Sequence, residues 1–310
     1  MPFASRCLAL PVLVLAATAP AATGQPSDNT IVVKGTRLDP TQARQRAVDF
    51  VNRTGVAHGQ QQVARWVVPV CIKVIGLRAS HAARFEQLML DVAREANMRV
   101  AKPNCEPNIT VTFAADARQV VRHINGRKPR QLDELSPTEK EQLLNGEAPV
   151  RWWYATQMLD RDGVQSNNIA APWITVGGTP VALPIVDGVT ATQQYNGGSN
   201  VRTPTVRSLY GATVIVDAEK AGKTPIDAVA AYAAMVAFAE MNASEPPADS
   251  ILGLFRPESI EASLTDWDLA FLKSLYRMPL DRRSRIQRGH LVNALLDERL
   301  PKAGSAKSRE

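Results

Sequence analysis

The chain of 310 residues is 45% hydrophobic and 21% charged, a composition typical of a globular protein with a sizeable core. Its formal net charge is +6, but residues 277–310 carry nine Lys and Arg against four Asp and Glu, so most of the positive excess lies near the C-terminus. This distribution argues against a nucleic-acid-binding face on the main domain, and we expect no nucleic-acid partner.

The N-terminus has the three parts of a secretory signal peptide. A basic residue, Arg6, precedes the apolar run Leu8–Ala17, and small residues follow, with cleavage expected within Ala21–Gly24. We therefore expect residues 1–24 to be removed and the mature protein to be periplasmic or extracellular. No apolar stretch of the mature chain reaches the roughly 18 residues that cross a bilayer, so we expect no transmembrane segment.

Two cysteines, Cys71 and Cys105, remain once the signal peptide has taken Cys7 with it. In an oxidising compartment two thiols most simply form one disulfide, which we predict here. The alternatives are a shared metal ion or a catalytic thiol. Both are disfavoured because neither cysteine has a histidine or a second cysteine beside it at ligand spacing.

The mature chain divides into three parts. Residues 25–60 hold an extended arm at Ile31–Gly35 and a helix at Thr41–Thr54, where apolar residues recur at helical spacing. Residues 61–280 form the main domain, and residues 281–310 form a basic C-terminal helix and tail.

The main domain alternates strands and helices. Its first half predicts strand Val67–Ile75, helix Ser80–Asn97 capped by Ser80, strand Ile109–Phe113, a helix from Asp116, a helix capped by Ser136 and strand Val150–Met158. Residues 157–206, rich in Gly, Asn, Thr and Pro, follow as a hairpin-like insertion. The second half predicts strand Leu209–Val216, a helix with Thr224 as cap and Pro225 as first residue, an apolar turn at Ile251–Phe255, helix Asp266–Arg277 capped by Thr265 and helix Ser284–Leu300. The expected fold class is α+β, a mixed sheet with packed helices.

One helix is unusual because it is apolar all round. From Ala228 to Ala239 it has twelve consecutive apolar residues, too few to span a bilayer. We expect it to be buried on every side, with its alanines allowing neighbours to approach closely.

Several catalytic signatures are absent from the sequence. The four histidines of the mature chain lie at positions 58, 81, 123 and 290, so no two sit one helical turn apart as a His-Glu-x-x-His zinc site requires. Neither Gly-x-Ser-x-Gly nor Gly-x-Gly-x-x-Gly occurs. The segment Asp217–Thr224 imitates a phosphate loop, but a carboxylate stands where the first glycine belongs, so we interpret it as a turn with a helix cap. We expect no metal and no cofactor.

Carboxylates offer the remaining route to catalysis. The candidates are Asp217, Glu219, Asp266 and Asp268, with Glu240 near the end of the apolar helix. Hydrolysis of a glycosidic bond needs two carboxyl groups about 5–10 Å apart, a distance that the sequence does not give. Asp266 and Asp268 have a simpler role, since they complement the positive end of their own helix. The aromatic run Trp152–Tyr154 could form a platform for sugar or peptide, although a half-buried strand packs the same residues.

Two short segments carry a family resemblance. Leu264–Tyr276 begins Leu-Thr-Asp-Trp-Asp and ends in Leu-Tyr, and Ser250–Leu252 reads Ser-Ile-Leu. These segments, with the order of elements over about residues 65–280, resemble the zincin-like metallopeptidase fold, particularly a group of uncharacterised exported bacterial proteins. The resemblance implies that strand 209–216 precedes the helix that occupies the active-site position of that family.

The chain departs from the family at that helix. Its residues include Tyr232, Ala233, Met235 and Val236 where the resemblance implies His-Glu-x-x-His, so no zinc ligand and no general base carry over. We therefore expect a zincin-like layout without a metal site. The expected function is binding or scaffolding without catalysis, with an envelope component or a protein as partner. The alternative is a carboxylate-dependent hydrolase acting on cell-envelope material, and a third interpretation makes Ile31–Gly35 an arm that adds a strand to a partner's sheet.

Overall fold

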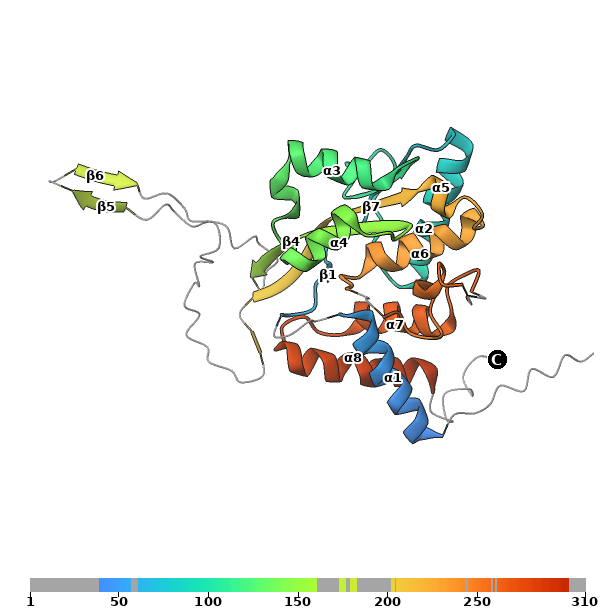
Figure 1. Ribbon diagram of the computed structural model, residues 1–310. Helices are drawn as coiled ribbons and strands as arrows, with labels where there is room; N and C mark the ends of the chain where they lie inside the picture. Colours follow the sequence, from blue (N-terminus) through green and yellow to red (C-terminus); the bar gives the residue numbers. More distant parts are fainter. Residues whose placement is uncertain are drawn as a thin grey trace, which may run out of the picture. The chain divides into compact units, whose positions relative to one another are not determined.

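The computed structural model describes most of the main domain and its flanking helices (Figure 1). The described residues are 39–56, 61–160, 173–176, 179–182, 202–203, 205–242, 245–257, 259 and 261–300. The predicted signal peptide, the arm at Ile31–Gly35 and most of the insertion 157–206 lie outside them. Two short strands within the insertion, β5 (Trp173–Val176) and β6 (Thr179–Ala182), pair as an antiparallel hairpin.

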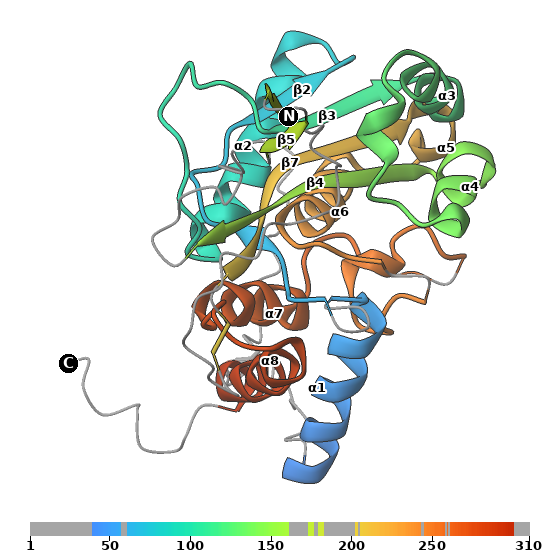
Figure 2. The same cartoon turned by 90° about the vertical axis from the view of Figure 1, so that its left-hand side faces the viewer.

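The main sheet is organised around the long strand β7 (Thr205–Asp217). On one side β7 pairs in parallel with β1 (Arg65–Trp66) and β3 (Ile109–Ala114), and β3 in turn pairs in parallel with β2 (Ile72–Ile75). On its other side β7 pairs antiparallel with β4 (Val150–Asp160), which forms one edge of the sheet. Figure 2 shows β2, β3, β7 and β4 side by side. The expected mixed sheet with packed helices is thereby confirmed.

Helices cover both faces of this sheet and continue beyond it. They are α1 (Pro40–Thr54), α2 (Ala79–Glu95), α3 (Ala117–Arg127), α4 (Pro137–Asn145), α5 (Ala218–Ala221), α6 (Ile226–Phe238), α7 (Asp266–Arg277) and α8 (Ser284–Arg299), with 3₁₀ turns η1 (Pro129–Leu132) and η2 (Ile251–Gly253). Helix α8, the predicted C-terminal helix, packs on α7 and α1. In the part of the chain that the structure describes, no helix combines the length and apolar character needed to span a membrane.

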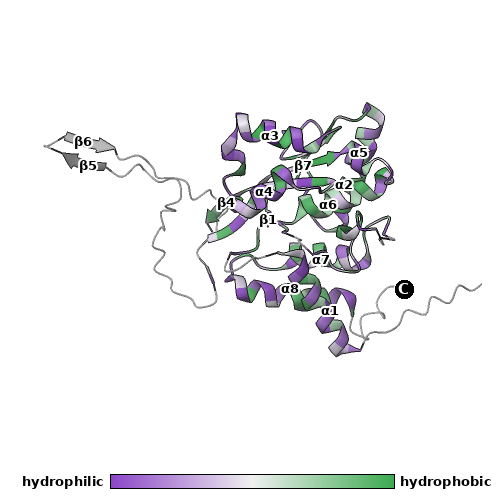
Figure 3. Ribbon diagram, viewed as in Figure 1, coloured by the Kyte–Doolittle hydropathy of each residue, from purple (hydrophilic) through white to green (hydrophobic). Residues whose placement is uncertain are grey.

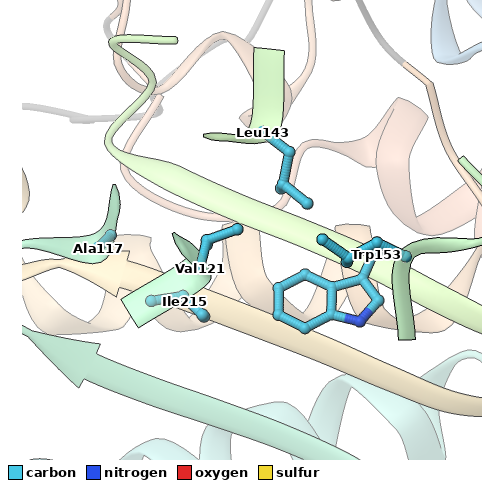
Figure 4. Close-up of a cluster of buried hydrophobic side chains, with 6 residues drawn as sticks. Ala117, Val121, Leu143, Trp153 and Ile215 are labelled. Atoms are coloured by element: carbon cyan, nitrogen blue, oxygen red, sulfur yellow. The ribbon is translucent and has the colours of Figure 1, made fainter. Parts of the chain in front are cut away.

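Neighbouring residues of β4 define the two faces. Trp153 belongs to a buried cluster with Val121 of α3, Leu132 of η1 and Leu143 of α4 (Figure 4). Its neighbour Trp152 points to the opposite face, because successive side chains of a strand alternate, and there it packs against α6. The sheet therefore separates a layer of α3, η1 and α4 from the layer that contains α6.

The predicted disulfide between Cys71 and Cys105 is present. Their Cα atoms lie 6.1 Å apart, and the bridge joins the residue before β2 to the loop that precedes β3. Asn108 of the same loop accepts a hydrogen bond from the backbone N–H of Cys71 at 2.8 Å and donates one to the carbonyl of Pro69 at 3.0 Å. The bridge and this asparagine together fix the loop 105–108 to the start of β2.

Two predicted helix caps, Ser136 and Thr265, are confirmed, and so is the helix predicted to start at Asp116. The side chains of Asp116, Ser136 and Thr265 accept hydrogen bonds from the first turns of α3, α4 and α7, respectively. Such caps act over two or three residues, so the local sequence suffices to specify them.

Three local predictions are wrong. Helix α2 begins at Ala79, because the carbonyl of Arg78 accepts the first helical bond from Ala82, which places the predicted cap Ser80 inside the first turn. Helix α6 is capped by Pro225, whose carbonyl accepts from Val229, while the N–H of Thr224 closes the preceding turn on Ala221.

The third wrong prediction is the continuous strand Val67–Ile75. Strand β2 covers only Ile72–Ile75, and Val70 makes an isolated bridge to Val100. The backbone of Val70 bonds Arg99 and Ala101 instead of β3, so the ladder of β2 does not extend back to Val67.

Candidate functional site

Helix α6, the all-apolar helix of the sequence, is enclosed by protein. Every residue from Ala228 to Phe238 is buried, as its all-apolar sequence predicts. The helix contacts α2, β7, η2 and α7, and Figure 3 shows it as a predominantly hydrophobic segment. Alanines at most of these positions allow such close neighbours on all sides.

Aromatic rings pack around the central residues of α6. The ring of Tyr232 makes edge contacts with Trp152 of β4 and Phe255, with centroids 6.1 and 5.2 Å apart. Burial raises the pKa of Tyr232, so its phenol stays neutral. Met235 is fully buried and the adjacent Ala233 and Val236 are buried too. The structure thus places Tyr232, Ala233, Met235 and Val236, the residues predicted to replace a zinc motif, in packed core.

The C-terminal end of α6 is held by aromatic hydrogen-bond donors. Tyr154 lies with its phenolic oxygen 2.6 Å from the Val236 carbonyl oxygen and also accepts from the N–H of Met241 at 3.1 Å. The indole of Trp66 donates to Ala237 at 2.9 Å, and Tyr276 donates to Phe238 at 2.7 Å. These bonds satisfy carbonyls that a helix leaves without partners in its last turn. The spacing of residues in sequence gives no signal of this arrangement, because the donors come from β1, β4 and α7.

Two of the four candidate carboxylates are buried and accept hydrogen bonds at helix N-termini. Asp217 accepts from the N–H of Lys220 at 3.0 Å, which caps the short helix α5 that the sequence pattern did not predict, and from the N–H of Ala117 at 3.3 Å. Asp268 accepts from Ser250 Oγ and the N–H of Ile251 as well as from Thr265. Burial raises the pKa of Asp268, and these hydrogen bonds oppose that shift.

The other carboxylates lie in different surroundings. Asp266 is exposed and pairs with Arg299 at 2.9 Å, and Glu219 is exposed on α5. Glu240 forms a half-buried ion pair with Arg207 of β7, and burial raises its pKa against the opposing effect of that arginine. Each of the predicted carboxylates therefore has its own local environment, and none of them lines the cleft described next.

A cleft of about 620 Å³ lies on the sheet face that also carries α3 and η1. Residues before and after the sheet strands line it, namely Glu106, Pro107 and Asn108 of the disulfide loop, Arg130 and Gln131 of η1, and Glu134 just after η1. The strands contribute Thr110 of β3; Trp153, Tyr154 and Ala155 of β4; and Tyr210, Gly211, Ala212 and Thr213 of β7. Trp153, Thr213 and Thr110 lie opposite one another in register, so they share this face.

The aromatic run Trp152–Tyr154 does not form one platform. The side chains of Trp152 and Tyr154 contact α6, whereas the side chain of Trp153 is 3% exposed and belongs to the buried cluster beneath α3. The cleft instead exposes the ring of Tyr210, which the sequence prediction missed. A weak signal was available, because Thr110 and Thr112 put polar residues on alternate positions of a central strand, which marks one face of it as incompletely covered.

The described residues contain no cluster of three or more His, Cys, Asp or Glu side chains placed to hold a metal ion. In comparisons with protein-family models, curated proteins and solved structures, none matches this chain.

Proposed function

We propose that this chain is an exported, non-catalytic binding protein built on a zincin-like scaffold that has lost its metal site. The observation that carries the proposal is the buried state of α6 from Ala228 to Phe238. At the position where the resemblance implies zinc ligands and a general base, the helix offers only apolar side chains and the neutral phenol of Tyr232.

The two segments that carry the resemblance contact each other, which supports the scaffold. The Ser-Ile-Leu segment supplies the cap, Ser250, and the first two residues of η2, which packs on α6. Its Ser250 donates to Asp268 of the Leu-Thr-x-x-Asp segment at 2.5 Å, and Asp268 also bonds Thr265. The sequence similarity thus coincides with one buried polar network that joins the turn to α7.

The disulfide supports the exported part of the proposal. Disulfides persist in oxidising compartments such as the periplasm and are rare in the cytosol. The pairing of Cys71 with Cys105 accords with the signal peptide predicted at residues 1–24.

Zinc content tests the loss of the metal site. The mature protein is incubated with equimolar zinc, desalted and examined by elemental mass spectrometry, beside an aliquot treated with a chelator. We expect both samples to contain only trace zinc. One zinc ion per chain that the chelator removes would overturn the proposal.

A carboxylate-dependent hydrolase acting on envelope material is the alternative function, favoured by the two carboxylates, Glu106 and Glu134, in the cleft. Single replacement of Asp217, Glu219, Asp266 and Asp268, together with E106Q and E134Q, tests it with purified peptidoglycan as the substrate. The alternative requires turnover by the wild-type protein and its loss in at least one variant whose unfolding free energy is unchanged.

A further inference from the structure

The cleft presents an exposed aromatic ring because of an irregularity in the sheet. Along β4 and β7, Ala155 pairs with Gly211 and the next residue, Thr156, pairs with Leu209, so Tyr210 has no partner on β4. A β-bulge of this kind redirects the side chain of the extra residue. Tyr210 is 49% exposed and lines the cleft. Its ring offers a flat apolar surface with a polar tip.

The floor of the cleft beside this ring is shallow and polar. It consists of backbone and short side chains, including Ala155, Gly211 and the hydroxyl-bearing Thr110 and Thr213. A Cβ atom at Gly211 would lie only 3.3 Å from that of Ala155. Because glycine has no side chain, the space above the sheet at this point stays open. A flat ligand can therefore lie against the sheet and next to the tyrosine.

Planar polar side chains surround the floor with unused hydrogen-bonding capacity. Arg130, Gln131 and Glu106 line the cleft, and their side chains make no hydrogen bond or ion pair with another residue that the structure describes. In one plane, a guanidinium presents paired donors, a carboxylate presents paired acceptors, and an amide presents a donor NH2 beside an acceptor oxygen. That geometry matches adjacent hydroxyl groups on a ring.

The charge of the cleft is nearly balanced. Arg130 contributes one positive charge, and the carboxylates of Glu106 and Glu134 contribute two negative ones, of which Glu134 lies 3.9 Å from the guanidinium of Arg207. A polyanion would meet two carboxylates, and a polycation would meet Arg130. The balance favours an uncharged polar ligand.

Two of the walls are fixed in place before any ligand arrives. Glu134 accepts from the backbone N–H of Thr156 at 2.9 Å and from its hydroxyl at 2.6 Å. The opposite wall belongs to the loop that the disulfide and Asn108 tie to β2. A preformed site loses less conformational entropy on binding, and a volume of about 620 Å³ lies within the usual range for small-ligand sites.

We propose that this cleft binds a neutral saccharide chain, with one sugar ring stacked on Tyr210 and its hydroxyl groups hydrogen-bonded to Gln131, Arg130 and Glu106. The inference rests on the proposed binding function and names the ligand class for it. The exposed ring of Tyr210 suits the apolar faces of a sugar ring. The polar floor and the planar polar side chains around it suit the hydroxyl groups at the edge of that ring, and the nearly balanced charge suits an uncharged ligand.

Calorimetric titration of the mature protein tests the site, with N-acetylchitotetraose and cellotetraose as probes. Heparin oligosaccharide and a neutral extended peptide serve as the charged and non-sugar comparisons. We expect at least one of the two neutral saccharides to bind and the comparison ligands not to. Tyr210→Ala should weaken that binding about tenfold or more, and Gln131→Ala should weaken it too.

Ile75→Ala is the matched control. Ile75 is also an exposed apolar residue of the same sheet, at 50%, but it does not line the cleft, so its removal should leave saccharide affinity unchanged. Failure of both saccharides to bind at millimolar concentration would overturn the inference, as would binding that Tyr210→Ala leaves intact or binding of only heparin or the peptide. If the protein contains no zinc and binds neither saccharide, this inference is refuted, but the proposed loss of the metal site still stands.

Discussion

The phenolic oxygen of Tyr154 lies 2.6 Å from the carbonyl oxygen of Val236, which joins the edge strand β4 to the last turn of the buried helix α6. Burial raises the pKa of this phenol well above its ordinary value, so it is a neutral donor at neutral pH. The same oxygen accepts from Met241 and so also fixes the chain that leaves the helix.

Tyr154→Phe should therefore destabilise the protein by about 1–3 kcal/mol, the cost of leaving buried polar groups without a partner. The free energy of unfolding from urea denaturation measures the effect. Tyr210→Phe removes the same hydroxyl from an exposed tyrosine and should change stability by less than about 0.5 kcal/mol. Equal effects of the two substitutions would show that the Tyr154 hydrogen bonds do not hold α6.

Asp268→Ala should destabilise strongly, by about 3 kcal/mol or more, because it leaves several buried donors from Ser250, Ile251 and Thr265 unsatisfied. Asp266→Ala is the control, since this exposed carboxylate two residues away makes a surface ion pair with Arg299 and faces the positive end of α7, two interactions that each contribute about 0–1 kcal/mol. Thermal unfolding of both variants gives the comparison. A small loss at Asp268 would contradict the structural role assigned to its network.

Lowering the pH should stabilise the wild-type protein relative to the Glu240→Gln variant. Burial, the largest influence, raises the folded-state pKa of Glu240 above its ordinary value of 4.5. The folded chain then binds more protons than the unfolded chain at pH values between the two pKa values, so the contribution of Glu240 to stability grows as the pH falls through that window. Below pH 4.5 this gain in stability is complete. At pH values above the folded-state pKa, Glu240 is charged in the folded protein, and the full free-energy cost of burying that charge is present.

Urea denaturation of both proteins at pH 7 and again near pH 5 measures this difference. Asp268 is present in both, so its own titration cancels. A wild-type protein that loses stability relative to the variant on acidification would mean that the ion pair with Arg207 outweighs burial.

Replacement of both cysteines by serine should lower the free energy of unfolding by about 3–4 kcal/mol in the chain-entropy account, because Cys71 and Cys105 are separated by 34 residues. The measurement compares the double variant with the oxidised wild-type protein in denaturant. Peptide mapping without reduction should recover Cys71 and Cys105 in one linked fragment. Two separate alkylated fragments would show that the purified protein does not carry the bridge.

Local patterns predicted several elements correctly because the interactions that specify them act over a few residues. Asp116, Ser136 and Thr265 each cap the helix that follows them, and those bonds reach only two or three residues along the chain. The cap predicted at Thr224 failed because α5 and its closing turn occupy that residue, an effect of how β7 connects to α6.

The sequence by itself predicted correctly that Ala228–Phe238 would form a buried helix, since an all-apolar helix has no face suited to water, and that Cys71 would pair with Cys105, the two cysteines outside the predicted signal peptide. Only the tertiary structure decided that Trp152 and Trp153 serve opposite faces of the sheet and that Tyr210 opens onto a cleft. The physical reason is register. The pairing of β4 with β7 joins residues about 60 positions apart, and the bulge in that pairing depends on neither segment alone.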